Sequence, residues 1–275
     1  MPRITALNIY PVKSCRGIAL ERARITATGF EHDREWLIVH PDGRFLTQRE
    51  EPRLALIEPA LTAQALRLSA PGHEPLSVAL DERGASTQVI CWKDTCAALD
   101  AGRAAADWLT TLLGRPVRLV RFDPHGTRSS SSRWTGAVQA RIQFADAFQW
   151  LLISQASLDD LNARLERPLP MNRFRPNIVA AGLPAYAEDQ VHEYERAGVR
   201  LRTAKPCTRC VIPTTNQLTG EREGGEPLRT LRRYRYSREL EGVMFGQNLM
   251  LIAGAGETLC VGDTLQVRWK PGAGL

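Results

Sequence analysis

The first hundred residues contain many short β-prone segments separated by turn residues, and this pattern constrains the fold more than any other feature. The strongest segment is EWLIVH at residues 35–40, and Pro41, Asp42 and Gly43 after it predict a hairpin turn. Short strands at this spacing favour a barrel or a sandwich over βαβ units. Further strands are expected at residues 4–12, 19–28, 54–58, 65–69, 76–80 and 87–92.

The rest of the chain adds a few helices to this pattern. Apolar residues recur at helical spacing over residues 101–114, Ser157 is expected to cap a second helix over 157–165, and Pro227 opens a short third one. We therefore expect a mainly β fold with a few helices (α+β). The further strands expected are 117–122, 174–181, 197–204 and 243–253, with a β-hairpin over 258–269 that turns at Gly262 and Asp263.

A loop rich in Ser, Gly and Arg follows the first strands and the first helix. Residues 125–136 (HGTRSSSSRWTG) show no periodicity. They are interpreted either as a mobile surface loop or as a lid in which Arg128, Arg133 or Trp134 touches a ligand. The loop is also the best domain boundary, so two domains are predicted, residues 1–122 and 123–275.

Composition excludes several classes of protein. The chain has no run of 18 uncharged apolar residues, so no membrane association is predicted. The N-terminal MPRITALNIYPVKSC indicates a strand rather than a signal peptide, and the expected location is the cytoplasm. The net charge of +6 fits either nucleic acid or an anionic cofactor. Because Lys and Arg are scattered rather than clustered, no stable nucleic-acid binding is predicted.

Two cysteines three positions apart, Cys207 and Cys210, stand beside Arg209 in the segment KPCTRCVIPTT. They could complete a structural zinc site with Cys91 and Cys96. A thioredoxin-like dithiol is disfavoured, because the sequence that follows resists the helix that such a site requires. The third interpretation is that one thiolate is the sole protein ligand of a metal carried by an anionic organic cofactor.

Three other short motifs are ambiguous when each is taken alone. Lys13 and Ser14 end a strand and could bind an anion or form a surface turn. Arg34 could bind a ligand or pair with the adjacent Asp33. Arg175 is held in an extended backbone by Pro176, and Asn177 can both donate and accept, as the edge of a heterocycle requires.

Taken together, the motifs resemble the MOSC-domain molybdoproteins, specifically the amidoxime-reducing component and its bacterial 6-hydroxylaminopurine-detoxifying relatives. The resemblance runs nearly from end to end, over YPVKSCRG, GFEHDREWLIV, TQREEPRLALI, SQASLDDLNARL, NRFRPNIV, KPCTRC and FGQNLMLI. It implies a β-rich N-terminal domain and a MOSC β-barrel domain with the cofactor in the cleft between them. The implied cofactor is molybdenum bound to molybdopterin.

The resemblance also implies roles for particular residues. Cys210 would be the molybdenum ligand and the catalytic residue, whereas Cys207 is not carried over as a ligand. Phe148 stands where relatives often have Ser, so no pterin contact is carried over to it. The implied cofactor-binding residues are Lys13, Ser14 and Arg34 at the phosphate, and Arg175 and Asn177 at the pterin.

The activity implied by the resemblance is reduction of N-hydroxylated small molecules, namely hydroxylamines, amidoximes and N-hydroxylated bases, in detoxification. Some relatives carry a C-terminal ferredoxin-like domain, which this sequence lacks. An external electron donor is therefore expected, a ferredoxin-, flavodoxin- or cytochrome-like protein with its reductase. The alternative is a non-enzymatic carrier or sensor of the molybdenum cofactor or of sulfur.

Overall fold

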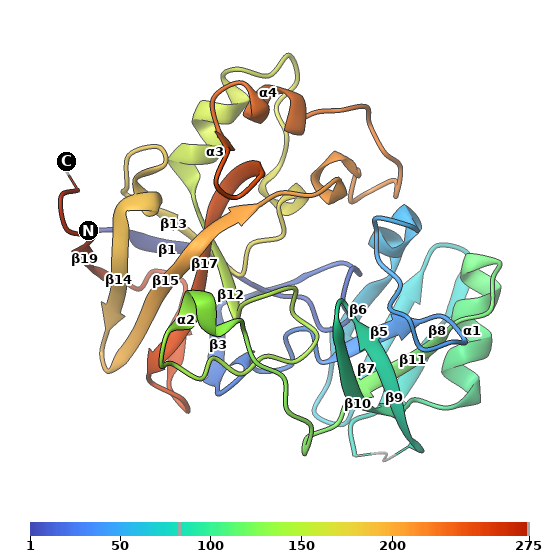
Figure 1. The fold of residues 1–275 in the computed structure, drawn as a ribbon. Helices are drawn as coiled ribbons and strands as arrows, with labels where there is room; N and C mark the ends of the chain where they lie inside the picture. The colour runs from blue at the N-terminus through green and yellow to red at the C-terminus, as the bar shows by residue number, and fades with distance from the viewer. Residues whose placement is uncertain (82–83, 274–275) are drawn as a thin grey trace.

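The computed structural model describes residues 1–81 and 84–273 and shows two lobes of β-structure side by side (Figure 1). The larger lobe contains a nine-stranded sheet in the order β19-β14-β15-β17-β12-β13-β1-β2, with β16 paired to β17 off this path. Its strands are β1 (Arg3–Ile9), β2 (Ile18–Leu20), β12 (Trp150–Ser154), β13 (Ile178–Ala181), β14 (Val191–Arg196), β15 (Val199–Thr208), β16 (Tyr236–Ser237), β17 (Gly242–Ala253) and β19 (Gln266–Trp269).

The smaller lobe contains a four-stranded sheet, β5-β11-β10-β9, and a three-stranded sheet, β6-β7-β8. A further three-stranded sheet, β18-β3-β4, belongs to the larger lobe. These strands are β3 (Arg22–Thr26), β4 (Gly29–Phe30), β5 (Trp36–Val39), β6 (Glu58–Leu61), β7 (Ala65–Ala70), β8 (His73–Ala79), β9 (Ser86–Cys91), β10 (Asp94–Asp100), β11 (Arg118–Phe122) and β18 (Thr258–Cys260).

The helices are few and short, as the sequence predicts. Helix α1 follows β10 and buries Ala105, Leu109 and Leu113 in the core of the smaller lobe. It ends at Gly114, whose left-handed backbone places its N–H on the carbonyl of Thr110. The α-helices are α1 (Arg103–Leu113), α2 (Ser132–Thr135), α3 (Gln155–Asn162) and α4 (Leu228–Arg232), and the 3₁₀ helices are η1 (Pro52–Leu56), η2 (Met171–Arg173), η3 (Ala187–Gln190) and η4 (Ile212–Thr214).

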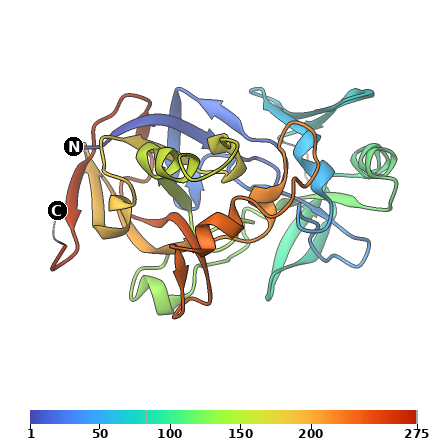
Figure 2. The same cartoon turned by 90° about the horizontal axis from the view of Figure 1, so that it is seen from above.

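The first strand of the chain belongs to the larger lobe, although most of that lobe comes from the second half of the sequence. Strand β1 pairs antiparallel with β13 on one side and with β2 on the other. Both chain ends consequently lie on the same lobe (Figure 2). The two lobes thus interleave in sequence, and the domain boundary between residues 122 and 123 stays a prediction.

The mainly β fold is confirmed, but the large sheet is not a closed barrel within the described residues. Its pairing path ends at β19 and β2. An isolated bridge from Arg3 to Thr264 and a few backbone hydrogen bonds beside it link the start of β1 to the segment before β19, without a continuous ladder. Close packing inside the sheet depends on Gly246, whose backbone is left-handed (φ 81°). An added Cβ there would lie 2.9 Å from the carbonyl oxygen of Leu152, so this glycine lets β17 pass β12.

Several local expectations were wrong for identifiable reasons. Residues 52–56 form η1 rather than a strand, because Pro52 begins the turn and the Glu51 side chain accepts a hydrogen bond from the N–H of Arg53. The cap of α3 is Ser154, while the Ser157 hydroxyl donates to the carboxylate of Glu188. The expected hairpin over 258–269 is absent from the described residues, because β18 pairs with β3 and β19 pairs with β14. The predictions also missed β10, β12 and β14.

Across the described residues, no helix combines the length and the apolar composition needed to cross a bilayer.

Candidate functional site

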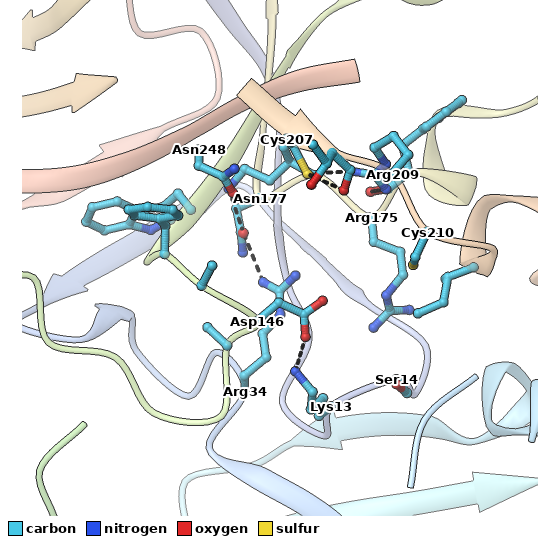
Figure 3. A pocket seen from close by; sticks show the side chains of 18 of the residues that line it. Lys13, Ser14, Arg34, Asp146, Arg175, Asn177, Cys207, Arg209, Cys210 and Asn248 are labelled. Atoms are coloured by element: carbon cyan, nitrogen blue, oxygen red, sulfur yellow. Dashed lines mark hydrogen bonds and ion pairs between the residues drawn. The ribbon is translucent and has the colours of Figure 1, made fainter. Parts of the chain in front are cut away.

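A pocket of about 780 Å³ is lined by all six residues singled out in the sequence (Figure 3). They come from distant parts of the chain. Lys13 and Ser14 follow β1, Arg34 precedes β5, Arg175 and Asn177 precede β13, and Cys210 follows β15. The fold therefore brings together every residue of the four motifs that the resemblance implicates.

Three of these residues adopt left-handed backbone conformations that are uncommon for residues other than glycine. The φ angles are 70° at Ser14, 51° at Arg34 and 57° at Arg175. The extended backbone expected at Arg175 from the following Pro176 was therefore wrong. Left-handed conformations cost about 1 kcal/mol or more each and persist only where the surroundings enforce them. At Arg34 the enforcing contact is a 2.9 Å hydrogen bond from its N–H to the carbonyl of Tyr10, and at Arg175 a 3.2 Å bond to that of Asn172.

The Tyr10 ring forms cation–π contacts with two cations of the pocket. The guanidinium carbons of Arg34 and Arg175 lie 4.4 Å and 4.2 Å from the ring centroid. Arg34 Nη1 donates to Asp33 Oδ2 (2.5 Å) and to Asn177 Oδ1 (2.9 Å). The Asp33–Arg34 ion pair expected from the sequence is therefore present, and it orients Arg34 along the pocket wall rather than removing it from the pocket.

Asn177 is fully engaged with the protein. Its Oδ1 also accepts from the N–H of Leu151 (3.2 Å), and its Nδ2 donates to the carbonyl of Asn8 (3.1 Å). The side chain ties β1, β12 and β13 together at the pocket floor. Its geometry is that of a residue that positions Arg34, with its hydrogen-bonding capacity used within the protein.

Arg175 provides the strongest sign that the pocket receives an anion. The residue is 8% exposed, and burial lowers the pKa of its guanidinium to about 10. No carboxylate, carbonyl or hydroxyl of residues 1–81 and 84–273 accepts a hydrogen bond from this guanidinium. Its nitrogens are not among the buried atoms that lack a partner, so its donors reach the pocket space. An anionic group bound there would accept from them and offset the cost of taking this charge out of water.

Sequence reasoning missed Asp146, which lies at the pocket mouth. Its carboxylate forms an ion pair with the buried ammonium of Lys13 and lies 3.5 Å from Nη2 of Arg49. Burial would raise the pKa of Asp146, but Lys13 and Arg49 hold it below its ordinary range. The carboxylate therefore neutralises one cation of the pocket, Lys13. Nothing in the local sequence marks it, since its partners are far away along the chain.

The two cysteines of the pocket differ in their contacts. Cys207 packs against the apolar cluster under β17, and Nη1 of Arg209 lies 3.2 Å from its sulfur. Cys210 lines the pocket, and in the described part of the chain its thiol has no hydrogen-bond partner. A short 3₁₀ turn, η4, follows Cys210 in place of the α-helix that a thioredoxin-like dithiol needs.

The structural zinc site that the sequence left open finds no support. Cys91 and Cys96 are buried in the smaller lobe, whereas Cys207 and Cys210 line the pocket. Residues 1–81 and 84–273 contain no cluster of three or more His, Cys, Asp or Glu that could hold a metal ion. A metal at Cys210 would therefore need its other ligands from a bound organic group.

Comparison with known proteins agrees with this geometry. The family description "MOSC N-terminal beta barrel domain" matches residues 1–116, and "MOSC domain" matches residues 139–266. Mitochondrial amidoxime-reducing component 1 of Mus musculus is 37% identical over 89% of this chain and 74% of the relative, and the Homo sapiens protein is 35% identical over 89% and 75%. Molybdenum cofactor sulfurase of Bos taurus is 32% identical over 80% of this chain and 27% of that protein.

Proposed function

Because the chain belongs to the MOSC-domain family that includes the amidoxime-reducing components, we propose that it is a molybdenum-cofactor-dependent reductase of N-hydroxylated compounds. The substrates would be hydroxylamines, amidoximes and N-hydroxylated bases. Molybdopterin carries a phosphate and a dithiolene, so its pocket must combine cations with a soft metal ligand. The Cys210 thiol and the cations of the pocket described above support this proposal.

The observation that carries the proposal is the Arg175 guanidinium, a buried cation that faces the pocket with unused donors. The fit extends to the Ser14 hydroxyl, which has no hydrogen-bond partner within the described ranges of the chain. Lys13, Ser14 and Arg34 would hold the phosphate, and Arg175 would contact the pterin. Cys210 would be the metal ligand. Asn177 would act through Arg34, whose guanidinium it orients.

When bound, the cofactor supplies the two-electron chemistry that removes the N-hydroxyl oxygen. The protein's residues bind and orient it. Arg34 and Arg175 are held against Tyr10 before any ligand arrives, so little side-chain entropy is lost on binding. Lys13 must exchange its ion pair with Asp146 for the phosphate. Pre-organised cations of this kind favour tight retention of a charged cofactor.

Electrons would come from an external ferredoxin-, flavodoxin- or cytochrome-like protein. The net charge of +6 would favour approach of an acidic donor by electrostatic steering. The cytoplasm remains our proposed location; the word "mitochondrial" in the relatives' names describes those proteins.

A second candidate follows from the likeness to molybdenum cofactor sulfurase. The chain would then carry or sense the cofactor or sulfur without reducing a substrate. The pocket would be the same, so only turnover separates the two functions.

The decisive experiment measures metal and turnover on one preparation. Protein purified from a molybdenum-replete host should contain near-stoichiometric molybdenum and should reduce benzamidoxime to benzamidine with a chemically reduced viologen dye. Molybdenum without turnover of any N-hydroxylated compound would favour the carrier. Absence of molybdenum and pterin from such protein would contradict the reductase and the cofactor carrier, and would leave only a carrier of sulfur.

A further inference from the structure

A second pocket of about 1500 Å³ adjoins the first and shares Asp146, Ala147 and Phe148 with it. Its remaining lining consists mostly of Ser and charged side chains and includes three aromatic rings. Phe45 and Trp92 come from the smaller lobe, and Trp134 comes from α2 in the loop that joins the two lobes. None of these three rings lines the first pocket, so the role proposed for that pocket does not explain them.

Trp92 lines this pocket and has a left-handed backbone conformation that is unfavourable for residues other than glycine. It occupies the first central position of the two-residue turn between β9 and β10, with φ 61°. That position favours glycine, because any Cβ is strained there. The indole is nevertheless 42% exposed. A strained residue with a large exposed ring is typical of a functional position.

The contacts of Trp92 fix the ring beside Asp146, which lines both pockets. The Phe45 ring lies 5.1 Å away between centroids, and the Arg49 guanidinium lies 4.6 Å from the indole. Indole Nε1 donates to Asp146 Oδ1 at 3.4 Å. The ring therefore has a set orientation before any ligand binds.

Trp134 belongs to the segment interpreted from the sequence as a mobile loop or a lid. Arg128 ties this segment down, since its buried guanidinium donates to the carbonyls of Gln143 (2.8 Å) and Ala145 (2.6 Å). Its Nε donates to Asp94 Oδ2 (2.8 Å), and Asp94 closes the same hairpin turn that carries Trp92. The Lys205 ammonium lies 5.2 Å from the Trp134 ring. One ion pair thus couples the two segments that present the tryptophans.

We propose that this second pocket binds the flat aromatic ring of an N-hydroxylated amidine or heteroaromatic hydroxylamine, and that Trp92 and Trp134 determine this specificity. Two indoles present stacking surfaces that favour planar rings over aliphatic chains. Asp146 lines both pockets. Once Lys13 has exchanged Asp146 for the cofactor phosphate, the Asp146 carboxylate accepts hydrogen bonds from the N–H groups beside the N-hydroxyl group. The inference rests on the proposed function and adds to it the pocket and the two residues that select ring-bearing members of the proposed substrates.

The kinetic test compares benzamidoxime with acetamidoxime, which lacks the ring. In Trp92→Ala and in Trp134→Ala, the ratio of the KM for benzamidoxime to that for acetamidoxime should rise about ten-fold, the loss of one ring–ring contact. Trp92→Phe retains an aromatic ring and should restore most of the ratio. Trp108→Phe, on α1 and outside both pockets, is the control for indole loss elsewhere. An unchanged ratio in both alanine variants would overturn the proposal.

A binding measurement separates this inference from the proposed reductase activity. Benzamidoxime should quench the tryptophan fluorescence of the purified holoprotein at saturating concentration, and the Trp92→Phe, Trp134→Phe double variant should lose most of that quench while Trp108→Phe keeps it. If no N-hydroxylated compound is turned over but this pattern holds, the aromatic site stands and the reductase function fails. If turnover occurs but quenching is unaffected by the double variant, the aromatic site fails alone.

Discussion

Two pairs of cysteines in this protein, each close together in the sequence, have opposite environments. Cys91 and Cys96 lie on β9 and β10, buried with Val89, Ala98 and Phe122. Burial raises the pKa of both thiols, that of Cys96 to about 11. Cys207 and Cys210 line a pocket among cations. The comparison teaches that spacing between cysteines does not determine their chemistry, because a thiol becomes a ligand or stays inert according to burial and nearby charge.

Removing the pocket thiol should have the largest effect on this comparison. In Cys210→Ala, bound molybdenum should fall to near zero, because the only proposed protein ligand of the metal is lost. Cys96→Ala, a matched change in the other pair, should retain molybdenum. Metal analysis of the purified variants by mass spectrometry checks this. Equal loss in the two variants would mean that the pairs do not differ as described.

The second largest difference between the two cysteine pairs is expected in the reactivity of their thiols. A water-soluble disulfide reagent should modify Cys210 in cofactor-free native protein and should modify Cys91 and Cys96 at least about a hundred-fold more slowly, since their exposure requires local unfolding. Mass spectrometry of the modified peptides over time provides the rates. Rapid labelling of Cys91 or Cys96 in folded protein would contradict their burial.

The role of the cations around Cys207 and Cys210 can be tested without changing either cysteine. Arg175→Gln should weaken retention of the pterin by about ten- to hundred-fold, because a charge-assisted contact to the cofactor is lost. Arg118→Gln removes a guanidinium that pairs with Asp100 outside the pocket, so it is the control. Pterin released on denaturation, measured by fluorescence after dialysis, reports the difference. Full pterin content in Arg175→Gln would contradict the role of Arg175 in holding the pterin.

The buried pair should affect stability rather than cofactor content, and this is the smallest effect. The pKa of Cys96 rises from 9.0 to about 11 on folding, so the unfolded state loses its proton first. The contribution of Cys96 is therefore present below pH 9 and is lost as the pH rises to about 11. The free energy of unfolding, measured with urea across this range, should decline less steeply in Cys96→Ala. Identical slopes would contradict the raised pKa.

The local structure followed from sequence where short-range signals were strong. Helix α1 ends at Gly114, as its periodicity and glycine predict, and β5, β7, β11 and β17 lie where strands were expected. The failures share a cause. Nothing near Thr258–Cys260 in the sequence reveals that this strand pairs with β3 rather than with β19, since pairing partners in a sheet are chosen by distant residues.

The candidate site shows the same division. Lys13, Ser14, Arg34, Arg175, Asn177 and Cys210 were found because each stands in a short recognisable motif. Asp146 and Trp92 were missed because no motif surrounds them. Their importance rests on the ion pair with Lys13 and on a strained turn, which appear only in three dimensions.

The sequence by itself determined the chemical inventory of this protein: a pair of thiols, several cations and many short strands. The tertiary structure alone decided that these groups share one pocket and that Asp146 pairs with Lys13 there. It also decided that a second pocket, with the rings of Trp92 and Trp134 in its lining, lies alongside. The physical reason is that side-chain chemistry is local to each residue, whereas burial, ion pairing and backbone strain depend on long-range strand pairing, which places β1 beside β13.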